Sequence, residues 1–261
     1  MKNIKPLVSW LLCTNRADNL LWRAIDSCLC QTLTNFELLI ITNGVEAKLI
    51  AKQVEERYIE DDRVCVLVSD IQMLNFNLSL GVWRARGQYL ARMDADDVSL
   101  PDRLATQVSF MDKHPEVIVL GSSYELIDAH DRLYGQVSLP CADSEIRKLL
   151  ITSNPFCHPS VMLRRQAIAD AGAYLGGRNA EDYDLWCRLS LMHADISIFA
   201  NLSQPLVRYN IDPSGAARRS REAYSNVVAS QVRAFLLTGR WRWFLGALLS
   251  TGKLLFRSAR Q

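Results

Sequence analysis

From residue 88 the chain reads Gln88-Tyr89-Leu90-Ala91-Arg92-Met93-Asp94-Ala95-Asp96-Asp97, an apolar run that leads directly into three carboxylates within four residues. Carboxylates this close raise one another's pKa unless a cation is present. Oxygen ligands of this kind suit Mg²⁺ or Mn²⁺, and such an ion neutralises a diphosphate. The stretch therefore predicts a strand that ends at a divalent-cation site. An acidic loop that caps the helix opened by Pro101 is the alternative interpretation.

Strand-like and helix-like segments alternate around this stretch. Apolar runs that are typical of strands lie at 8–13, 36–41, 64–68, 88–93 and 117–121. Between most of them, apolar residues recur at helical spacing. This alternation predicts an α/β fold with a mostly parallel central sheet and helices on both faces. Ligands bind beyond the carboxyl ends of such strands, where we expect Asn43, Asp70 and Asp94 to gather.

The pattern loosens after about residue 121. We expect short strands at 124–127, 133–137, 160–163 and 205–209, and a helix at 143–151. A further helix opens at Glu181-Asp182. The positive end of that helix favours ionised carboxylates, so these two residues either cap the helix or, if buried, supply a catalytic base.

The segment from Asn154 to Ser160 contains two prolines and one histidine, which predicts a rigid turn before a strand. His158 in this turn is a candidate for a hydrogen bond to a sugar or a phosphate. A purely structural role in the turn is the alternative.

Composition favours a compact folded protein. Hydrophobic residues make up 49% of the 261 residues and charged residues 22%, which excludes disorder as the main state. The seven cysteines have neither the spacing of a disulfide framework nor the paired spacing of a zinc site. The first apolar run is too short for a signal peptide or a membrane span. We therefore expect a cytoplasmic protein with reduced cysteines.

The net charge of +2 conceals an asymmetry. Residues 216–261 hold nine Lys and Arg and one acid, so this segment carries +8 and the rest of the chain −6. One helical stripe of the segment carries the residues Trp241, Phe244, Leu245, Leu248, Leu255 and Phe256. Such a helix can lie in the headgroup region of an anionic bilayer, so we expect peripheral contact through 240–260 with the inner face of the cytoplasmic membrane.

Packing of this helix on the rest of the chain, or on a second subunit, is the alternative. The aromatic residues lie on the apolar stripe, so we expect them to be buried and not presented to bases. We therefore do not expect nucleic acid as a partner.

Several motifs in one order resemble the inverting GT-A-fold glycosyltransferases of family 2, which make bacterial O-antigen, capsule and lipopolysaccharide sugars. These motifs are the segments 8–16 and 85–97, the run Pro101-Asp102-Arg103-Leu104 ending in Gln107, the segment 154–160, and Glu181-Asp182-Tyr183-Asp184-Leu185-Trp186. The resemblance covers about residues 6–212. It implies a GT-A domain over 1–215, with a donor-binding half at 1–121 and an acceptor-side half at 122–215, followed by a basic helical tail at 216–261.

The resemblance also implies roles for individual residues. Asp182 would be the catalytic base, and Asp96 would hold Mn²⁺ or Mg²⁺ on the diphosphate. A nucleotide-sugar donor would be bound by Thr14, Arg16, Asn43, Asp70 and Asp94. A saccharide or lipid-linked acceptor would be bound by His158 and Glu181. Asp212 would be a second metal ligand.

Two positions depart from the family pattern. Thr42-Asn43 replaces an acidic pair before Gly44, and Asp212 replaces the histidine of a Tyr-Arg-x-His motif. Asn43 still offers a donor and an acceptor, whereas the charge of Asp212 disfavours contact with a diphosphate.

Two other functions stay open. A metal-dependent nucleotidyltransferase usually carries a glycine-rich loop after its first strand, which the segment 14–18 lacks. A non-catalytic donor-binding or scaffold protein of the same fold would need neither Asp96 nor Asp182.

Overall fold

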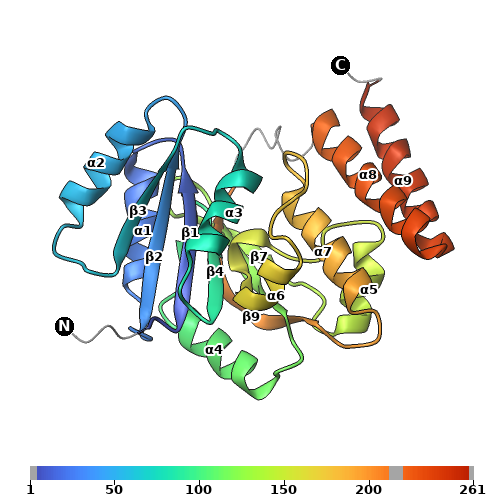
Figure 1. Cartoon of the computed structure of the whole chain (residues 1–261), viewed down its shortest axis with the longest axis horizontal. Helices are drawn as coiled ribbons and strands as arrows, with labels where there is room; N and C mark the ends of the chain where they lie inside the picture. The colour runs from blue at the N-terminus through green and yellow to red at the C-terminus, as the bar shows by residue number, and fades with distance from the viewer. Residues whose placement is uncertain (1–4, 212–219, 259–261) are drawn as a thin grey trace.

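The computed structural model describes residues 5–211 and 220–258, and its described part is built around one nine-stranded sheet (Figure 1). The strands are β1 (Val8–Thr14), β2 (Phe36–Asn43), β3 (Val64–Ser69), β4 (Tyr89–Met93), β5 (Val98–Ser99), β6 (Val119–Ile127), β7 (Leu133–Val137), β8 (Met162–Arg164) and β9 (Phe199–Asn210). Their order across the sheet is β3-β2-β1-β4-β8-β6-β9-β5, and β7 pairs with the outer part of β6.

The direction of the strands confirms the predicted α/β fold. β1, β2, β3 and β4 pair in parallel, and β6 and β9 run the same way as these four, while β5, β7 and β8 run in the opposite direction. Thr14 pairs with Thr42 and Leu12 with Met93, so β1, β2 and β4 end at the same edge of the sheet. This register places the residues that follow β4 beside Thr14 and Asn43.

Helices cover both faces of the sheet. They are α1 (Asn19–Leu29), α2 (Ala47–Arg57), α3 (Leu74–Arg84), α4 (Arg103–Lys113), α5 (Asp143–Leu150), α6 (Arg165–Asp170) and α7 (Glu181–Met192), and a 3-10 turn spans His158–Ser160. The side chain of Asp18 accepts a hydrogen bond from the Leu21 amide at 3.0 Å and caps α1. Trp10 and Leu12 pack on one face of the sheet and Leu11 on the other, each fully buried, because β1 lies in the sheet interior.

The helix α3 was not predicted, since its buried face is not apolar throughout. Asn77 is fully buried in it and donates to the Ile71 carbonyl at 2.8 Å, beside buried Leu78 and Val82. A Cβ at Gly81 would lie 2.8 Å from the Leu11 side chain, so the glycine permits the close approach of α3 to β1. The strands expected at 124–127 and 205–209 are the outer parts of β6 and β9, whose register shifts near Ser123.

Two long helices follow, α8 (Arg221–Thr238) and α9 (Trp241–Ser258). They pack side by side at the end of the molecule opposite α2, with α8 against α7 (Figure 1). Ser220 caps α8, and Gly239, at a φ of 65°, ends it. Within the described residues, no helix is long and apolar enough to cross a membrane.

The helix α9 has apolar residues on two faces, whereas the sequence predicted one. Trp243 and Ala247 are buried against the rest of the chain, while Trp241, Leu245 and Leu248 of the predicted stripe are exposed. A Cβ at Gly246 would lie 2.3 Å from the Ile151 carbonyl oxygen, which shows how closely α9 approaches the body of the protein. These three residues of the predicted stripe therefore remain accessible although α9 is packed.

Candidate active site

Two pockets adjoin at the carboxyl edge of β1, β2 and β4. The smaller one, of about 300 Å³, is lined by the end of β1, by Asn43, by the start of α3 and by the residues just before α7. The larger one, of about 520 Å³, lies between the 154–159 segment, the start of α7 and the helices α8 and α9. Both pockets are lined by Leu74, Asp94, Asn179 and Glu181, so they meet at two carboxylates.

The acidic residues after β4 form a compact cluster. One carboxylate oxygen from each of Asp94, Asp96 and Asp97 lies within 4.8 Å of the others. Asp97 is buried; one of its oxygens accepts a hydrogen bond from the Asn210 amide at 2.8 Å, and the other has no partner among the described residues. Burial and the neighbouring carboxylates raise the pKa of Asp97 well above its usual value, and raise that of Asp96 despite Arg16. A divalent cation held by these oxygens would remove this repulsion, so the residues fit the predicted metal.

Three arginines surround the cluster, and the sequence indicated only Arg16. The Arg16 guanidinium lies 3.2 Å from Asp96 and 3.0 Å from Asp18. Arg92 is buried at the end of β4 and is paired with Asp94. Burial alone would lower the pKa of Arg92, but the charge of Asp94 and its hydrogen bond raise it.

Arg23, on α1, is the third arginine. It donates to the Asp96 carbonyl at 2.8 Å and is paired with Asp131 at 2.6 Å. The Arg23 side chain therefore holds the turn of residues 94–97 by a hydrogen bond to the backbone of that turn.

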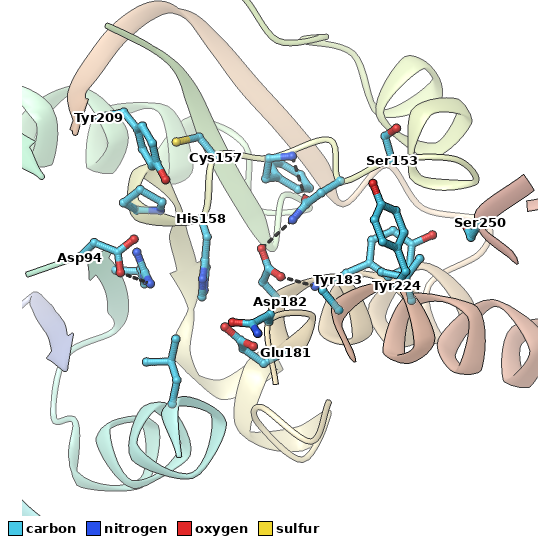
Figure 2. A pocket seen from close by; sticks show the side chains of 18 of the residues that line it. Asp94, Ser153, Cys157, His158, Glu181, Asp182, Tyr183, Tyr209, Tyr224 and Ser250 are labelled. Carbon is cyan, nitrogen blue, oxygen red and sulfur yellow. Dashed lines mark hydrogen bonds and ion pairs between the residues drawn. The ribbon is translucent and has the colours of Figure 1, made fainter. Parts of the chain in front are cut away.

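Two further carboxylates, Glu181 and Asp182, lie at the start of α7. Asp182 accepts hydrogen bonds from the Asn154 side chain at 2.6 Å and from the Tyr183 amide at 2.7 Å, yet burial raises its pKa above the usual value (Figure 2). Burial and the charge of Asp182 raise the pKa of Glu181 to about 7, and Oε2 of Glu181 has no hydrogen-bond partner within residues 5–211 and 220–258. Burial thus outweighs the positive end of the helix, which is the condition under which a carboxylate can act as a base.

His158 lines the larger pocket, between Asp94 and the start of α7 (Figure 2). Its Nε2 lies 3.1 Å from the Tyr174 hydroxyl, and its ring contacts Trp186 edge-on. These contacts orient the ring, so a structural role and a role in the pocket are compatible.

The remaining predicted residues fall into three groups. Thr14, Arg16 and Asn43 line the smaller pocket, and the Asn43 side chain donates to the Thr14 carbonyl at 2.8 Å. Asp70 is exposed after β3 and lines neither pocket. Asp212 lies outside the described residues.

Other lining residues were not predicted from the sequence. Gln72 and Asn75 reach the smaller pocket from the start of α3, and Arg178 reaches it from the loop before α7. Tyr224 on α8 and Lys253 on α9 line the larger pocket. Of these residues, only Arg178 lies close in sequence to a recognised motif, three residues before Glu181-Asp182, and could have been suspected from the sequence. The others depend on how distant helices pack.

Fold and site together define an α/β protein with an acidic cluster at the sheet edge between two pockets. Residues 9–172 match the family described as glycosyl transferase family 2. The O-antigen biosynthesis glycosyltransferase WbnJ of Escherichia coli is 34% identical over 254 residues, which are 97% of this chain and 98% of WbnJ. The amylovoran biosynthesis glycosyltransferase AmsE of Erwinia amylovora is 29% identical over 219 residues, 82% of this chain and 78% of AmsE.

Solved structures share the fold. S. aureus TarS 1-349 in complex with UDP-GlcNAc superimposes with a TM-score of 0.67 at 16% identity, over 87% of this chain and 66% of TarS 1-349. The mannosyltransferase PcManGT from Pyrobaculum calidifontis, in complex with GDP-Man and Mn²⁺, gives a TM-score of 0.62 at 14% identity, over 99% of this chain and 77% of PcManGT. The chain belongs to glycosyl transferase family 2 and is a glycosyltransferase.

Proposed function

We propose that this glycosyltransferase moves a sugar from a nucleotide-sugar donor to a hydroxyl of its acceptor, with inversion and with the help of Mn²⁺ or Mg²⁺. The observation that carries the proposal is that Asp94 and Glu181 line both pockets. A donor in the smaller pocket then presents its sugar to an acceptor in the larger one, next to the carboxylates of α7.

In this scheme Asp182 takes the proton of the acceptor hydroxyl, and the acceptor oxygen forms a bond to the anomeric carbon. The bond from that carbon to the diphosphate oxygen breaks, and its electron pair stays with the diphosphate. One displacement of this kind inverts the configuration at the carbon. A divalent cation, when bound, neutralises the negative charge of the diphosphate.

The other roles follow the two pockets. Asp96, with Asp212, is assigned to the metal. Thr14, Arg16, Asn43 and Asp94 are assigned to the donor, together with Asp70, which lines neither pocket. His158 and Glu181 are assigned to the acceptor, supported by their place in the larger pocket.

We assign the protein to the assembly of a surface polysaccharide, on a saccharide or lipid-linked acceptor. The similarity to WbnJ over nearly the whole of both chains and the similarity to AmsE support this assignment. We further propose that the exposed apolar residues of α9, with the basic residues Arg240 and Arg242, contact the inner face of the cytoplasmic membrane.

The test is nucleotide release from UDP-, GDP-, dTDP- and CMP-linked sugars, with Mn²⁺ or with EDTA, and with or without a lipid or oligosaccharide extract as acceptor. We expect one donor to release its nucleotide in a metal-dependent reaction that the acceptor accelerates. Pyrophosphate release from a nucleoside triphosphate and a sugar phosphate, with no release from any donor, would instead identify a nucleotidyltransferase. Donor binding without release would identify a scaffold.

A further inference from the structure

We propose that Arg178 binds the diphosphate of the donor, and that α8 positions the loop carrying Arg178 through Asn226. This inference rests on the proposed function. Arg178 lies after residue 172, where the match to the family ends, and α8 lies further along the chain. The inference therefore assigns a part of donor binding to the C-terminal part of this chain.

The first observation is the charge of Arg178. The smaller pocket is lined by two arginines, Arg16 and Arg178, and by three carboxylates. Arg16 is paired with Asp18 and Asp96, whereas no carboxylate of the described residues lies within 4.0 Å of the Arg178 guanidinium. An exposed guanidinium that lines an acidic pocket, with no carboxylate partner among the described residues, suits a phosphate, which it can bind with two parallel hydrogen bonds.

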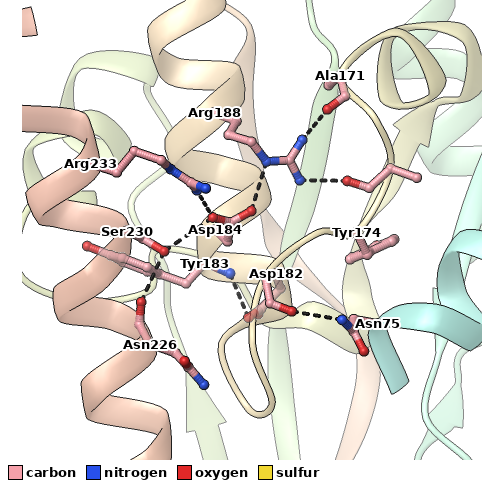
Figure 3. A network of polar contacts seen from close by, with 12 residues as sticks. Asn75, Ala171, Tyr174, Asp182, Tyr183, Asp184, Arg188, Asn226, Ser230 and Arg233 are labelled. Atoms are coloured by element: carbon pink, nitrogen blue, oxygen red, sulfur yellow. Dashed lines mark hydrogen bonds and ion pairs between the residues drawn. The ribbon is translucent and has the colours of Figure 1, made fainter. Parts of the chain in front are cut away.

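The second observation is that the loop 171–180 is fixed on the side of α3 and α7. The Asn75 side chain donates to the Gly176 carbonyl at 2.9 Å. Arg188 on α7 donates to the Ala173 carbonyl at 2.6 Å and also to the Ala171 carbonyl (Figure 3). A Cβ at Gly176 would lie 2.6 Å from the Cβ of Asp184, so this part of the loop packs tightly on α7.

The third observation is that α8 holds the loop at Arg178 itself. The Asn226 side chain donates to the Arg178 carbonyl at 2.9 Å. A Cβ at Gly177 would lie 2.4 Å from the Asn226 side chain, so the glycine is required for this contact. The contact fixes the backbone from which the Arg178 side chain enters the pocket.

The helix α8 is itself anchored to α7 by a buried charge network around Asp184 (Figure 3). Asp184 is paired with Arg188 at 2.8 Å and with Arg233 of α8, and it accepts a hydrogen bond from Ser230 at 3.3 Å. Ser230 also donates to the Asn226 carbonyl at 3.1 Å. A continuous set of contacts therefore runs from α7 through α8 to the loop that carries Arg178.

The test of Arg178 compares Arg178→Gln and Arg178→Lys with Arg84→Gln, a control at an exposed arginine that lines neither pocket. The full-length protein is titrated calorimetrically with UDP, GDP and dTDP in the presence of Mn²⁺, and with the monophosphate of whichever base binds. We expect Arg178→Gln to weaken the diphosphate about tenfold and the monophosphate less than about twofold. Arg178→Lys should lose less, and the control should match the wild type.

The test of positioning uses Asn226→Ala, with Ser225→Ala on the exposed side of α8 as its control. We expect Asn226→Ala to weaken the diphosphate about threefold in the wild-type background and not at all in the Arg178→Gln background, since both changes act on one contact. An equal loss in both backgrounds would overturn the role of α8. Wild-type affinity of Arg178→Gln for the diphosphate would overturn the role of Arg178. If no nucleoside diphosphate bound the wild type, the proposed diphosphate-linked donor would fall together with this inference.

Discussion

Glu181 and Asp182 are consecutive carboxylates with different surroundings. Asp182 is held by two hydrogen bonds, from Asn154 and from the Tyr183 amide. Glu181 is 6% exposed, and one of its oxygens has no hydrogen-bond partner in the part of the chain that the structure describes. These differences give Asp182 a fixed orientation and leave Glu181 protonated more readily, since burial and the charge of Asp182 raise its pKa to about 7. The geometry therefore suits Asp182 as an oriented base. Glu181 beside it, when protonated, can donate a hydrogen bond to an acceptor hydroxyl.

The raised pKa of Glu181 predicts an effect on stability. A carboxyl whose pKa rises from 4.5 in the unfolded chain to about 7 in the fold costs stability as pH rises through that interval. Glu181→Gln removes this cost, so it should stabilise the protein at about pH 8 relative to about pH 5, by up to about 3 kcal/mol. Urea unfolding of both proteins in EDTA at the two pH values measures the difference. A stability difference independent of pH would show that Glu181 is ionised normally in the fold.

The site residues that could be predicted from the sequence are those that belong to a contiguous motif. Asp94, Asp96, Glu181 and His158 line the two pockets, because each follows directly from the end or start of an element that the pattern predicts. Asp70 lies outside both pockets although it too follows a strand. Arg178 was not predicted as a site residue, because its place in the pocket depends on a loop fixed from two distant helices.

The helix α9 has one face packed on the body of the protein and another face exposed. Its buried face approaches Ile151 at Gly246, and its other face exposes the leucines of the predicted stripe. Tyr224 and Lys253 also line the larger pocket from α8 and α9. The packing of this element therefore contributes to the shape of the acceptor side.

Two glycines of α9 form a matched test of that packing. Gly246→Ala places a Cβ 2.3 Å from a backbone oxygen and should destabilise the protein by about 1–3 kcal/mol. Gly252→Ala meets nothing within 4 Å and should stabilise it by up to about 1 kcal/mol, because alanine favours helix. Urea unfolding of the two variants checks the signs. Stabilisation by both substitutions would contradict the close contact of α9 with Ile151.

Periodicity identified most elements, because most helices and strands bury a continuous apolar face. It failed for α3, where a buried asparagine and a glycine replace apolar residues, and it found only one of the two faces of α9. The buried face of α9 combines Trp243 and Ala247 with Gly246 and Ser250, so its apolar pattern is weak and tertiary contact reveals it.

A group of exposed apolar residues lies at the end of the molecule formed by α8 and α9. Leu236 and Leu237 of α8 lie at this end with Trp241, Leu245 and Leu248 of α9, all more than half exposed. The same two helices line the larger pocket. An acceptor held at a membrane surface would thus approach the pocket from the side of these helices. The boundary at residue 215 between a catalytic domain and a tail stays a prediction, since α8 packs on α7, α9 packs on α8, and both helices line the larger pocket.

Membrane contact is tested with the double variant Leu245→Glu, Leu248→Glu. We expect it to lose most of the binding of the wild type to vesicles of anionic phospholipid, because it places charge on the inserted face. Leu49→Glu on α2 is the control, since Leu49 is 54% exposed and Leu245 55%, at opposite ends of the molecule. Sedimentation with vesicles measures the bound fraction. Equal binding by the three proteins would contradict the membrane assignment.

Donor binding and turnover in Asp96→Asn and Asp182→Asn test the two-pocket site, with Asp195→Asn, at an exposed residue after α7, as the control. The two-pocket site predicts that the donor identified in the release assay, with Mn²⁺, raises the melting temperature of Asp182→Asn as much as that of the wild type, while kcat falls about 100-fold or more. Asp96→Asn should lose both the thermal shift and turnover. Normal turnover in Asp182→Asn would contradict the role of Asp182 as the base, and an unchanged donor shift in Asp96→Asn would contradict the role of Asp96 in holding the metal.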